Sequence, residues 1–206
     1  MSPTSNPVAY RRLLTSCAGA IALTTTVALL SSPLAKASSH PIGGLSAQEQ
    51  TSLRAGQVIL TGQNGQYTGR VLVAAPVATV WKLLTDYNNF ENYFPNVVSS
   101  QLLETKGNRK VFEQVYLIQA LIFSKRSRVR IAATETYPRQ IEFNLVDGDV
   151  DSLKGFWRLE PIGGDRVLVT HQVSIDPGST NRALFFGIYE DTLENTLRAI
   201  AQHSVN

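Results

Sequence analysis

The chain has 206 residues, a length that fits one domain or, at most, two. Hydrophobic residues make up 43% and charged residues 17% of the chain, a composition that excludes a disordered protein. The net charge is +3, and the only cysteine and methionine are Cys17 and Met1, which excludes a disulfide framework and a cysteine-based zinc site.

The first 37 residues predict a secretory signal peptide. They begin with a polar stretch that carries Arg11 and Arg12, continue with the apolar residues 13–30, and end at Ala35-Lys36-Ala37 after a Ser-Ser-Pro segment. A charged start, an apolar run, a helix breaker and a small-residue motif are the parts of an export signal, here cleaved after Ala37. We therefore expect export across the cytoplasmic membrane, to the periplasm or the extracellular space.

Two alternatives for this leader stay open. Residues 13–35 carry no charge and are long enough for an uncleaved membrane anchor, which would leave the domain lumenal or membrane-anchored on the same side. The Ser- and Thr-rich, acid-free composition also suits an organelle transit peptide. Arg11, Arg12 and Lys36 account for the net charge, so the remainder is neutral and lacks the broad positive field that nucleic acid binding requires.

Residues 38–56 are polar and predict a linker or lead-in with a short helix near residues 46–53, followed by one domain over residues 57–206. The domain starts with an alternating, β-rich segment at residues 67–74 that ends at Ala75-Pro76. Apolar residues at helical spacing from Val77 to Leu84 then predict a helix to about residue 86. Residues 87–95 predict a second short helix or an aromatic loop.

Six further strands follow, separated by turn residues such as Lys106-Gly107-Asn108 and Gly163-Gly164-Asp165. Such short turns predict antiparallel neighbours. Pro177-Gly178 ends the last strand, and a long amphipathic helix is expected to run to about His203. A helix of this kind must lie across one face of the sheet, and the hollow between them is a usual ligand site. The expected strands are residues 97–105, 110–118, 125–136, 139–146, 152–161 and 166–175.

Several segments of this chain resemble the START and polyketide cyclase-like (SRPBCC) superfamily. They are Ala75-Pro76, Val80-Trp81, the aromatic-proline segment Tyr93-Phe94-Pro95, and Gly155 to Leu159, within a similarity that spans residues 67–203. The closest branch is the polyketide cyclase/dehydrase or coenzyme-Q-binding START-like one. The resemblance implies an α+β helix-grip fold: a curved antiparallel sheet of six to seven strands around a long C-terminal helix, with two short helices after the first strand. Members bind lipids, sterols, isoprenoid quinones or polyketides, and only some catalyse a reaction.

The expected cavity between sheet and helix has ten candidate ligand-binding residues. Each can instead fill the core, and the aromatic residues of the connecting segment are the best candidates for the cavity mouth. The candidates are Trp81, Phe90, Tyr93, Phe94, Tyr116, Phe143, Trp157, His171, Phe185 and Tyr189.

Arg126, Arg128 and Arg130 alternate along one strand and therefore share one face. This face can contact an anionic headgroup, an acidic lipid surface or an acidic partner. The alternative, which we favour, is a solvated outer face paired with carboxylates such as Glu113 or Glu142.

The sequence shows no catalytic constellation and predicts no metal and no cofactor. His171 is in register with inward-facing valines and is either a core residue or an acid–base group. The segment Asp147 to Asp151 lacks the full calcium-loop pattern and predicts a polar hairpin turn.

We therefore expect a non-catalytic carrier for a small hydrophobic molecule, such as a lipid, isoprenoid or quinone, acting as a monomer without nucleic acid. One alternative is a polyketide cyclase or dehydratase that uses His171, Arg158 and Tyr116. Another is an assembly or scaffold factor in peripheral contact with a membrane through the arginine strand.

Overall fold

The computed structural model describes residues 42–120, 123–178 and 181–205. The leader, residues 1–37, lies outside the described residues, so its cleavage and the export that it implies stay predictions. The fold below belongs to the compact unit that begins at Ser38.

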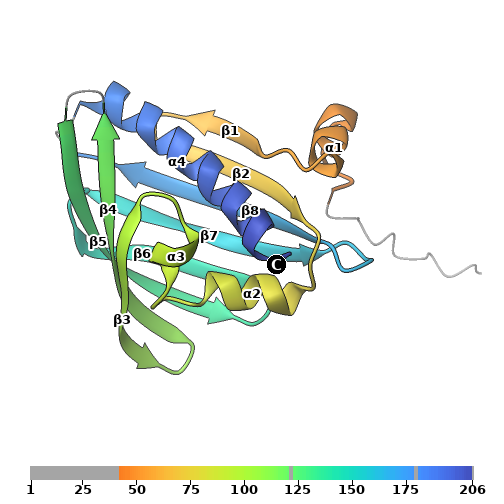
Figure 1. Ribbon diagram of the computed structural model, residues 1–206, viewed down its shortest axis with the longest axis horizontal. Coiled ribbons are helices and arrows are strands. Elements are labelled where there is room, and N and C mark those ends of the chain that lie inside the picture. Colours follow the sequence, from red (N-terminus) through yellow and green to blue (C-terminus); the bar gives the residue numbers. More distant parts are fainter. Residues whose placement is uncertain (1–41, 121–122, 179–180, 206) are drawn as a thin grey trace, which may run out of the picture. The chain divides into compact units, whose positions relative to one another are not determined.

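Eight antiparallel strands form one sheet in the order β1-β2-β8-β7-β6-β5-β4-β3 (Figure 1). Short connections join the successive strands from β3 to β8. Strand β2, which precedes α2 and α3 in the sequence, pairs with β8, the last strand. Register shifts in β3 and between β5 and β6 act as bulges that bend the sheet. The strands are β1 (Ile59–Gln63), β2 (Gln66–Val73), β3 (Val97–Lys106), β4 (Arg109–Ala120), β5 (Phe123–Thr136), β6 (Gln140–Gly148), β7 (Ser152–Pro161) and β8 (Val167–Asp176).

The predicted α+β helix-grip fold is confirmed, but its strand count of six to seven is wrong because β1 was missed. β1 pairs with β2 through a two-residue turn, Asn64-Gly65, in which both residues have positive φ (56° and 87°). Asn-Gly is the preferred sequence for such a hairpin turn, so the signal was present. The two short helices consequently follow the second strand instead of the first.

Two short helices connect β2 to β3. Helix α2 (Val77–Leu84) begins after Pro76 and buries Val80 and Leu84 along the predicted stripe. Helix α3 (Phe90–Tyr93) is a single turn that buries Phe90. Both lie on the face of the sheet that also carries the C-terminal helix (Figure 1).

Helix α4 (Arg182–His203) lies across this inner face, where the prediction placed it (Figure 1). Its N-cap is Asn181, whose side chain accepts a hydrogen bond from the Leu184 amide at 3.2 Å. Leu197 and Ile200 are completely buried in the core. Gly69 permits this packing, since a Cβ atom there would collide with Leu197 Cδ1. The helix is therefore fitted closely to β2, and any cavity must lie farther along the sheet.

Helix α1 (Ala47–Arg54) packs on the opposite, outer face of the sheet. Ser46 and Glu49 form a capping box at its start. Leu53 joins Ile42 and Leu168 in a small cluster of buried residues that is separate from the main core. Part of residues 38–56, the segment expected to be a linker, thus covers the outer face of the sheet. The domain boundaries expected from the sequence stay predictions.

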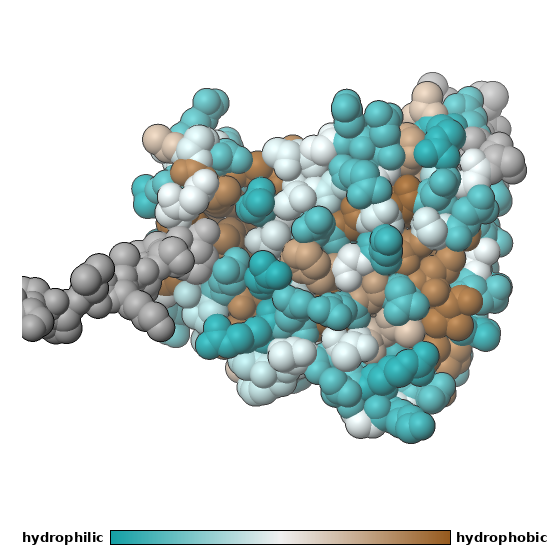
Figure 2. All heavy atoms as spheres, turned by 180° about the vertical axis from the view of Figure 1, so that it is seen from behind, coloured by the Kyte–Doolittle hydropathy of each residue, from teal (hydrophilic) through white to brown (hydrophobic). Residues whose placement is uncertain are grey.

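Hydrophilic side chains cover much of the molecule when it is viewed from behind Figure 1, with apolar patches between them (Figure 2). None of the helices in the described residues combines the length and the hydropathy that a membrane span requires. The main hydrophobic core lies on the inner face of the sheet, against α2, α3 and α4.

Candidate functional site

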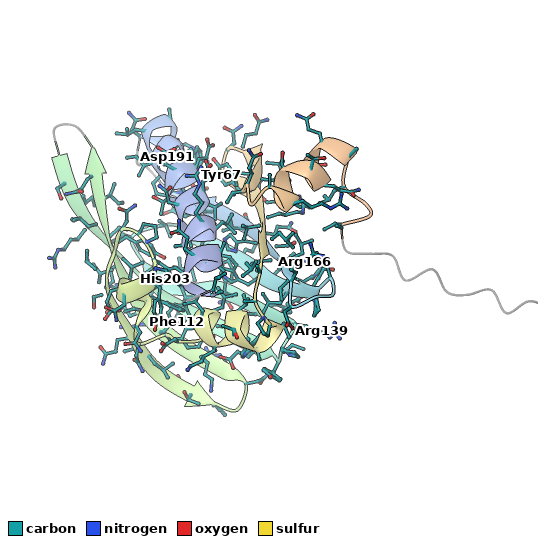
Figure 3. All side chains as sticks on the ribbon, turned by 45° about the vertical axis from the view of Figure 1, so that its right-hand side comes forward. Tyr67, Phe112, Arg139, Arg166, Asp191 and His203 are labelled. Atoms are coloured by element: carbon teal, nitrogen blue, oxygen red, sulfur yellow. The ribbon has the colours of Figure 1, made fainter. Side chains whose placement is uncertain are left out.

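A cavity of about 400 Å³ lies between the inner face of the sheet and helices α3 and α4. Its volume falls in the range of small-molecule sites. Strands β4 to β8 each contribute side chains, at alternating positions except in the last part of β4, where residues 116–119 all line the cavity, and α4 closes the opposite side. Figure 3 shows Phe112, which lines the cavity, near α3, and Tyr67 beside α4.

Three nearly parallel rings form one wall of the cavity. The His171 ring stacks on Trp157 with ring centroids 3.8 Å apart, and Phe143 lies 5.5 Å from His171 on the other side. Phe143 reaches across β7 because Gly155 has no side chain; a Cβ atom there would lie 2.8 Å from Phe143 Cζ. The imidazole is thus held between two aromatic rings, and only 5% of the residue is exposed.

A polar patch on β4 and β5 interrupts the apolar lining. Tyr116 and Ser127 are direct partners in the register of the two strands, and Gln114 is two residues from Tyr116 on the same face. The Tyr116 hydroxyl donates a hydrogen bond to Gln114 Oε1 at 3.1 Å. Gln114 and Ser127 are 5% and 7% exposed, so this patch is well removed from bulk water.

Helix α4 supplies the facing wall. Phe185 and Tyr189 stack with centroids 5.8 Å apart, and Tyr189 also contacts Tyr67. The Tyr67 hydroxyl donates to Glu190 Oε1 at 2.7 Å, which ties α4 to β2. Thr192 also faces the cavity, but its hydroxyl donates to the Ile188 carbonyl oxygen at 2.8 Å.

Aromatic residues at α3 close a third side. Phe90 contacts Phe94, Tyr87 and Phe112, with centroids 4.9 to 5.8 Å apart. Tyr87 stacks on Phe112 at 4.6 Å and its hydroxyl donates to Glu135 Oε1 at 2.9 Å. The connecting segment between α2 and β3 is therefore anchored to the sheet by its rings, and Phe90 and Phe94 line the cavity beside it.

The cavity contains no Asp, Glu, Lys or Arg side chain among the described residues. Burial lowers the pKa of His171 to about 3, an effect that a backbone group of Phe156 partly opposes. Burial likewise raises the pKa of Tyr116 to about 12. Both groups are therefore uncharged at neutral pH, and the lining as described is electrically neutral.

Eight of the ten predicted residues line the cavity, and Trp81 and Tyr93 do not. Trp81 is buried but contacts Tyr137 in an edge-to-face pair. Tyr93 turns away from the cavity; its ring contacts His203, and its hydroxyl donates to Asp86 Oδ2 at 3.0 Å. Helical spacing indicates that Trp81 and Tyr93 lie on the buried side of their segments, but it does not show which buried residues face the cavity. A binding role for the other eight stays a prediction.

The arginine strand faces outward, away from the cavity. Ser127 and Val129 line the cavity from β5, so Arg126, Arg128 and Arg130 must point to the other face. Arg128 and Arg130 each lie 3.0 Å from Glu113 Oε2, and Arg128 lies 2.6 Å from Asp147 Oδ2. The solvated, paired arrangement is the one found, with Asp147 in the place suggested for Glu142. A headgroup bound inside the cavity cannot use these arginines.

Two further predictions concern charged or chelating groups. Arg158 is exposed on the outer face, where its Nε donates to Gln140 Oε1 at 3.2 Å, so it does not serve as an inward-facing polar group. In the segment after β6, the Asp149 carboxylate accepts a hydrogen bond from the Arg128 amide at 2.8 Å. Within the described residues no three His, Cys, Asp or Glu side chains gather as metal ligands would.

Sequence reasoning missed Gln114 and Ser127. The signal that could have found them is the period-two pattern of β4 and β5, since Phe112, Gln114 and Tyr116 share one face.

Comparison with known proteins places this geometry in a family. A family model described as polyketide cyclase / dehydrase and lipid transport matches residues 73–200. A STAR-related lipid transfer protein fragment from Xanthomonas axonopodis has a similar structure, with 23% identity over 72% of this chain and 93% of that one and a TM-score of 0.61. The Zhui aromatase/cyclase from Streptomyces sp. R1128 has 17% identity over 72% and 94% of the two chains, with a TM-score of 0.55. A START superfamily protein from Mycobacterium smegmatis has 16% identity over 68% and 97%, with a TM-score of 0.58. No curated protein matches the sequence.

Proposed function

Because the chain belongs to the polyketide cyclase / dehydrase and lipid transport family, within a superfamily that binds small hydrophobic ligands, we propose that it is a non-catalytic carrier. The ligand is a small hydrophobic molecule held between the sheet and α4. The observation that carries this proposal is the cavity itself, which is of ligand size, mostly apolar and uncharged over its described lining.

Burial of apolar surface supplies the affinity. Each 100 Å² of apolar ligand surface removed from water contributes about 2.5 kcal/mol before the cost of ordering is subtracted. The walls favour such a ligand because stacked rings at Phe143 and Trp157 and at Phe185 and Tyr189 offer wide, rigid contact surfaces.

The protonation states of the lining support a carrier over an enzyme. General acid–base catalysis works best when the pKa of the group lies near the working pH. The pKa of His171 is lowered to about 3 and that of Tyr116 is raised to about 12. Neither group exchanges a proton readily at neutral pH, although both are suited to hydrogen bonding with a ligand.

Mass spectrometry of an organic extract from the purified protein tests the proposal. We expect one hydrophobic compound, or one class of them, in stoichiometric amount. Thr196→Phe places a ring in the cavity and should abolish this recovery, since Thr196 lines it. Asn195→Phe is the matched control, because Asn195 is exposed on the same helix. A folded wild-type protein that carries no compound, and binds none offered to it, contradicts the proposal.

A cyclase or dehydratase is the second candidate. It is favoured by the family description and by the similarity to an aromatase/cyclase. Of its three suggested groups, His171 and Tyr116 line the cavity and Arg158 does not. Turnover of a linear poly-β-ketone analogue that is lost in His171→Phe would favour this candidate over the carrier.

The site of action follows from the leader. If residues 1–37 direct export, the carrier works outside the cytoplasm or in a lumen, where a poorly soluble ligand needs a protein to cross an aqueous space.

A further inference from the structure

The ligand held in this cavity must be uncharged where it is buried. An ionised carboxylate or phosphate inside would lose its hydration without gaining a charged partner, since the described lining has none. An unpaired buried charge costs several kcal/mol. The outward arginines of β5 give no compensation, because they lie on the other face of the sheet, where Arg128 and Arg130 are paired with Glu113 and Arg128 also with Asp147.

The same lining contains hydrogen-bond donors that the protein does not use. Tyr116 donates to Gln114 Oε1, so the Gln114 side chain has its acceptor occupied and its NH₂ group free to donate. Within the described part of the chain, the structure places no partner on that nitrogen or on the Ser127 hydroxyl. Both residues are more than nine-tenths buried and line the cavity.

Several other polar groups of the cavity already have partners within the described residues. The Thr192 and Thr196 hydroxyls donate to carbonyl oxygens of α4. His171 Nδ1 is buried and has no partner among the described residues, and its ring stacks on Trp157 and Phe143. Gln114 and Ser127 are therefore the donors that lie side by side on β4 and β5 and are more than nine-tenths buried, whereas the Tyr189 hydroxyl faces the same cavity from α4.

We propose that this carrier selects an uncharged, largely apolar molecule that bears a carbonyl oxygen, and that Gln114 and Ser127 donate hydrogen bonds to that oxygen. The proposal rests on the proposed function and names its ligand class. Gln114 and Ser127 are diagonal neighbours across β4 and β5, about 7–8 Å apart at the backbone, so one acceptor between them is within reach of both. The Phe143, Trp157 and His171 rings then cover the apolar body.

Three matched probes with one aromatic body test the selection. They are 2-acetylnaphthalene, 2-naphthoate and 2-ethylnaphthalene, which carry a ketone, a carboxylate and no polar group, and their binding is measured by equilibrium dialysis at neutral pH. We expect the ketone to bind at least about a hundredfold more tightly than the carboxylate. Only the carboxylate carries a charge, and that charge must give up its hydration shell when it enters the cavity.

Gln114→Leu tests the role of the donors. It should weaken the ketone about fivefold to tenfold, the effect of one hydrogen bond, and leave 2-ethylnaphthalene bound as well as before or more tightly. Gln101→Leu is the matched control, because Gln101 is exposed on the adjacent strand β3 and pairs with Glu113 on the outer face. Ser127→Ala provides a second, smaller change if Gln114→Leu does not fold.

The outcomes separate the two proposals. If all three probes bind with equal affinity, or if both β4–β5 variants leave the ketone unaffected, the cavity binds ligands but the inferred selection is overturned. If no probe binds and no compound copurifies, the proposed function fails instead.

Discussion

His171 illustrates how neighbouring side chains set the chemistry of a single residue. Its ring lies between Trp157 and Phe143, its Nδ1 atom has no hydrogen-bond partner among the described residues, and burial lowers its pKa to about 3. If the ring were protonated, no carboxylate of the described cavity lining would be there to pair with it. The residue is therefore a neutral part of the wall under ordinary conditions.

The shifted pKa of His171 makes stability depend on pH. The unfolded chain binds a proton at this residue below about pH 6.5, whereas the folded chain does so only near pH 3. As the pH is lowered from about 6.5 to about 3, the free energy of unfolding should therefore fall by up to about 1.4 kcal/mol per pH unit, and the full contribution is present above pH 6.5. Urea unfolding at a series of pH values measures this slope.

His171→Phe keeps an aromatic ring in the stack and removes the proton. Its free energy of unfolding should decline less steeply than that of the wild type between about pH 6.5 and pH 4. His203→Phe, at the exposed end of α4, serves as the control and should follow the wild type. Parallel curves for all three proteins would show that His171 does not titrate as inferred.

The residue scale is also where sequence reasoning was least complete. His171 and Phe143 were placed inside correctly because strand periodicity fixes the facing of each position. The polar patch at Gln114 and Ser127 was not foreseen, since periodicity says which face a residue occupies but not whether that face borders a packed core or an open cavity. Trp81 shows the converse case, a buried ring whose contact is Tyr137.

At the scale of elements, two glycines of the sheet set how closely side chains and α4 pack around the cavity. Gly155 on β7 faces Phe143 on β6 in the register of the sheet and leaves room for that ring. Gly69 on β2 brings α4 close to the opposite end of the sheet. One glycine thus shapes the aromatic wall and the other closes the core beside it.

Gly155→Ala should damage both the fold and the site. The added Cβ atom would collide with the Gln172 carbonyl oxygen and lie 2.8 Å from Phe143 Cζ, so backbone and ring must both shift. We expect the free energy of unfolding to fall by about 3 kcal/mol. The variant molecules that do fold should bind the ligand more weakly. Gly44→Ala, whose Cβ would enter open space, is the control. An unchanged midpoint in urea for Gly155→Ala would contradict this account.

The elements themselves were largely predictable. The 3.6-residue stripes of α2 and α4 and the turns between β3 and β8 are strong local signals, and they located those elements to within a few residues. β1 was not predicted because its five residues include only two large apolar side chains, Ile59 and Leu60. The Asn64-Gly65 turn that follows it was not used as a hairpin signal. Pairing with β2, a tertiary interaction, defines that strand.

At the scale of the whole molecule, the two faces of the sheet have different tasks. The inner face holds the core and the cavity, while the outer face carries the arginine network and, near β2 and β8, helix α1. Sequence reasoning foresaw a hollow under α4 from the order of elements. The neutrality of the hollow could not be foreseen, because it depends on which of many charged residues face outward.

Because the cavity and helix α1 lie on opposite faces of the sheet, removal of α1 should affect stability and ligand binding differently. A protein that starts at Ser38, the expected product of leader cleavage, keeps every described residue and should unfold with the same midpoint as the processed natural protein. A protein that starts at Gln57 loses Ile42 and Leu53 from the outer-face cluster and exposes Leu168, which is 1% exposed in the structure. That loss should lower the free energy of unfolding by about 3 kcal/mol, the contribution of two large apolar side chains.

Ligand binding should respond differently, because the cavity is on the inner face and no described residue before Leu84 lines it. At a temperature where both proteins are folded, the chain from Gln57 should bind 2-acetylnaphthalene with the same affinity as the chain from Ser38. Intact mass of the processed natural protein gives the starting residue, and urea unfolding and dialysis give the two other quantities. Loss of affinity in step with stability would mean that α1 shapes the cavity through the sheet, and equal stability of the two chains would mean that the outer-face cluster does not support the fold.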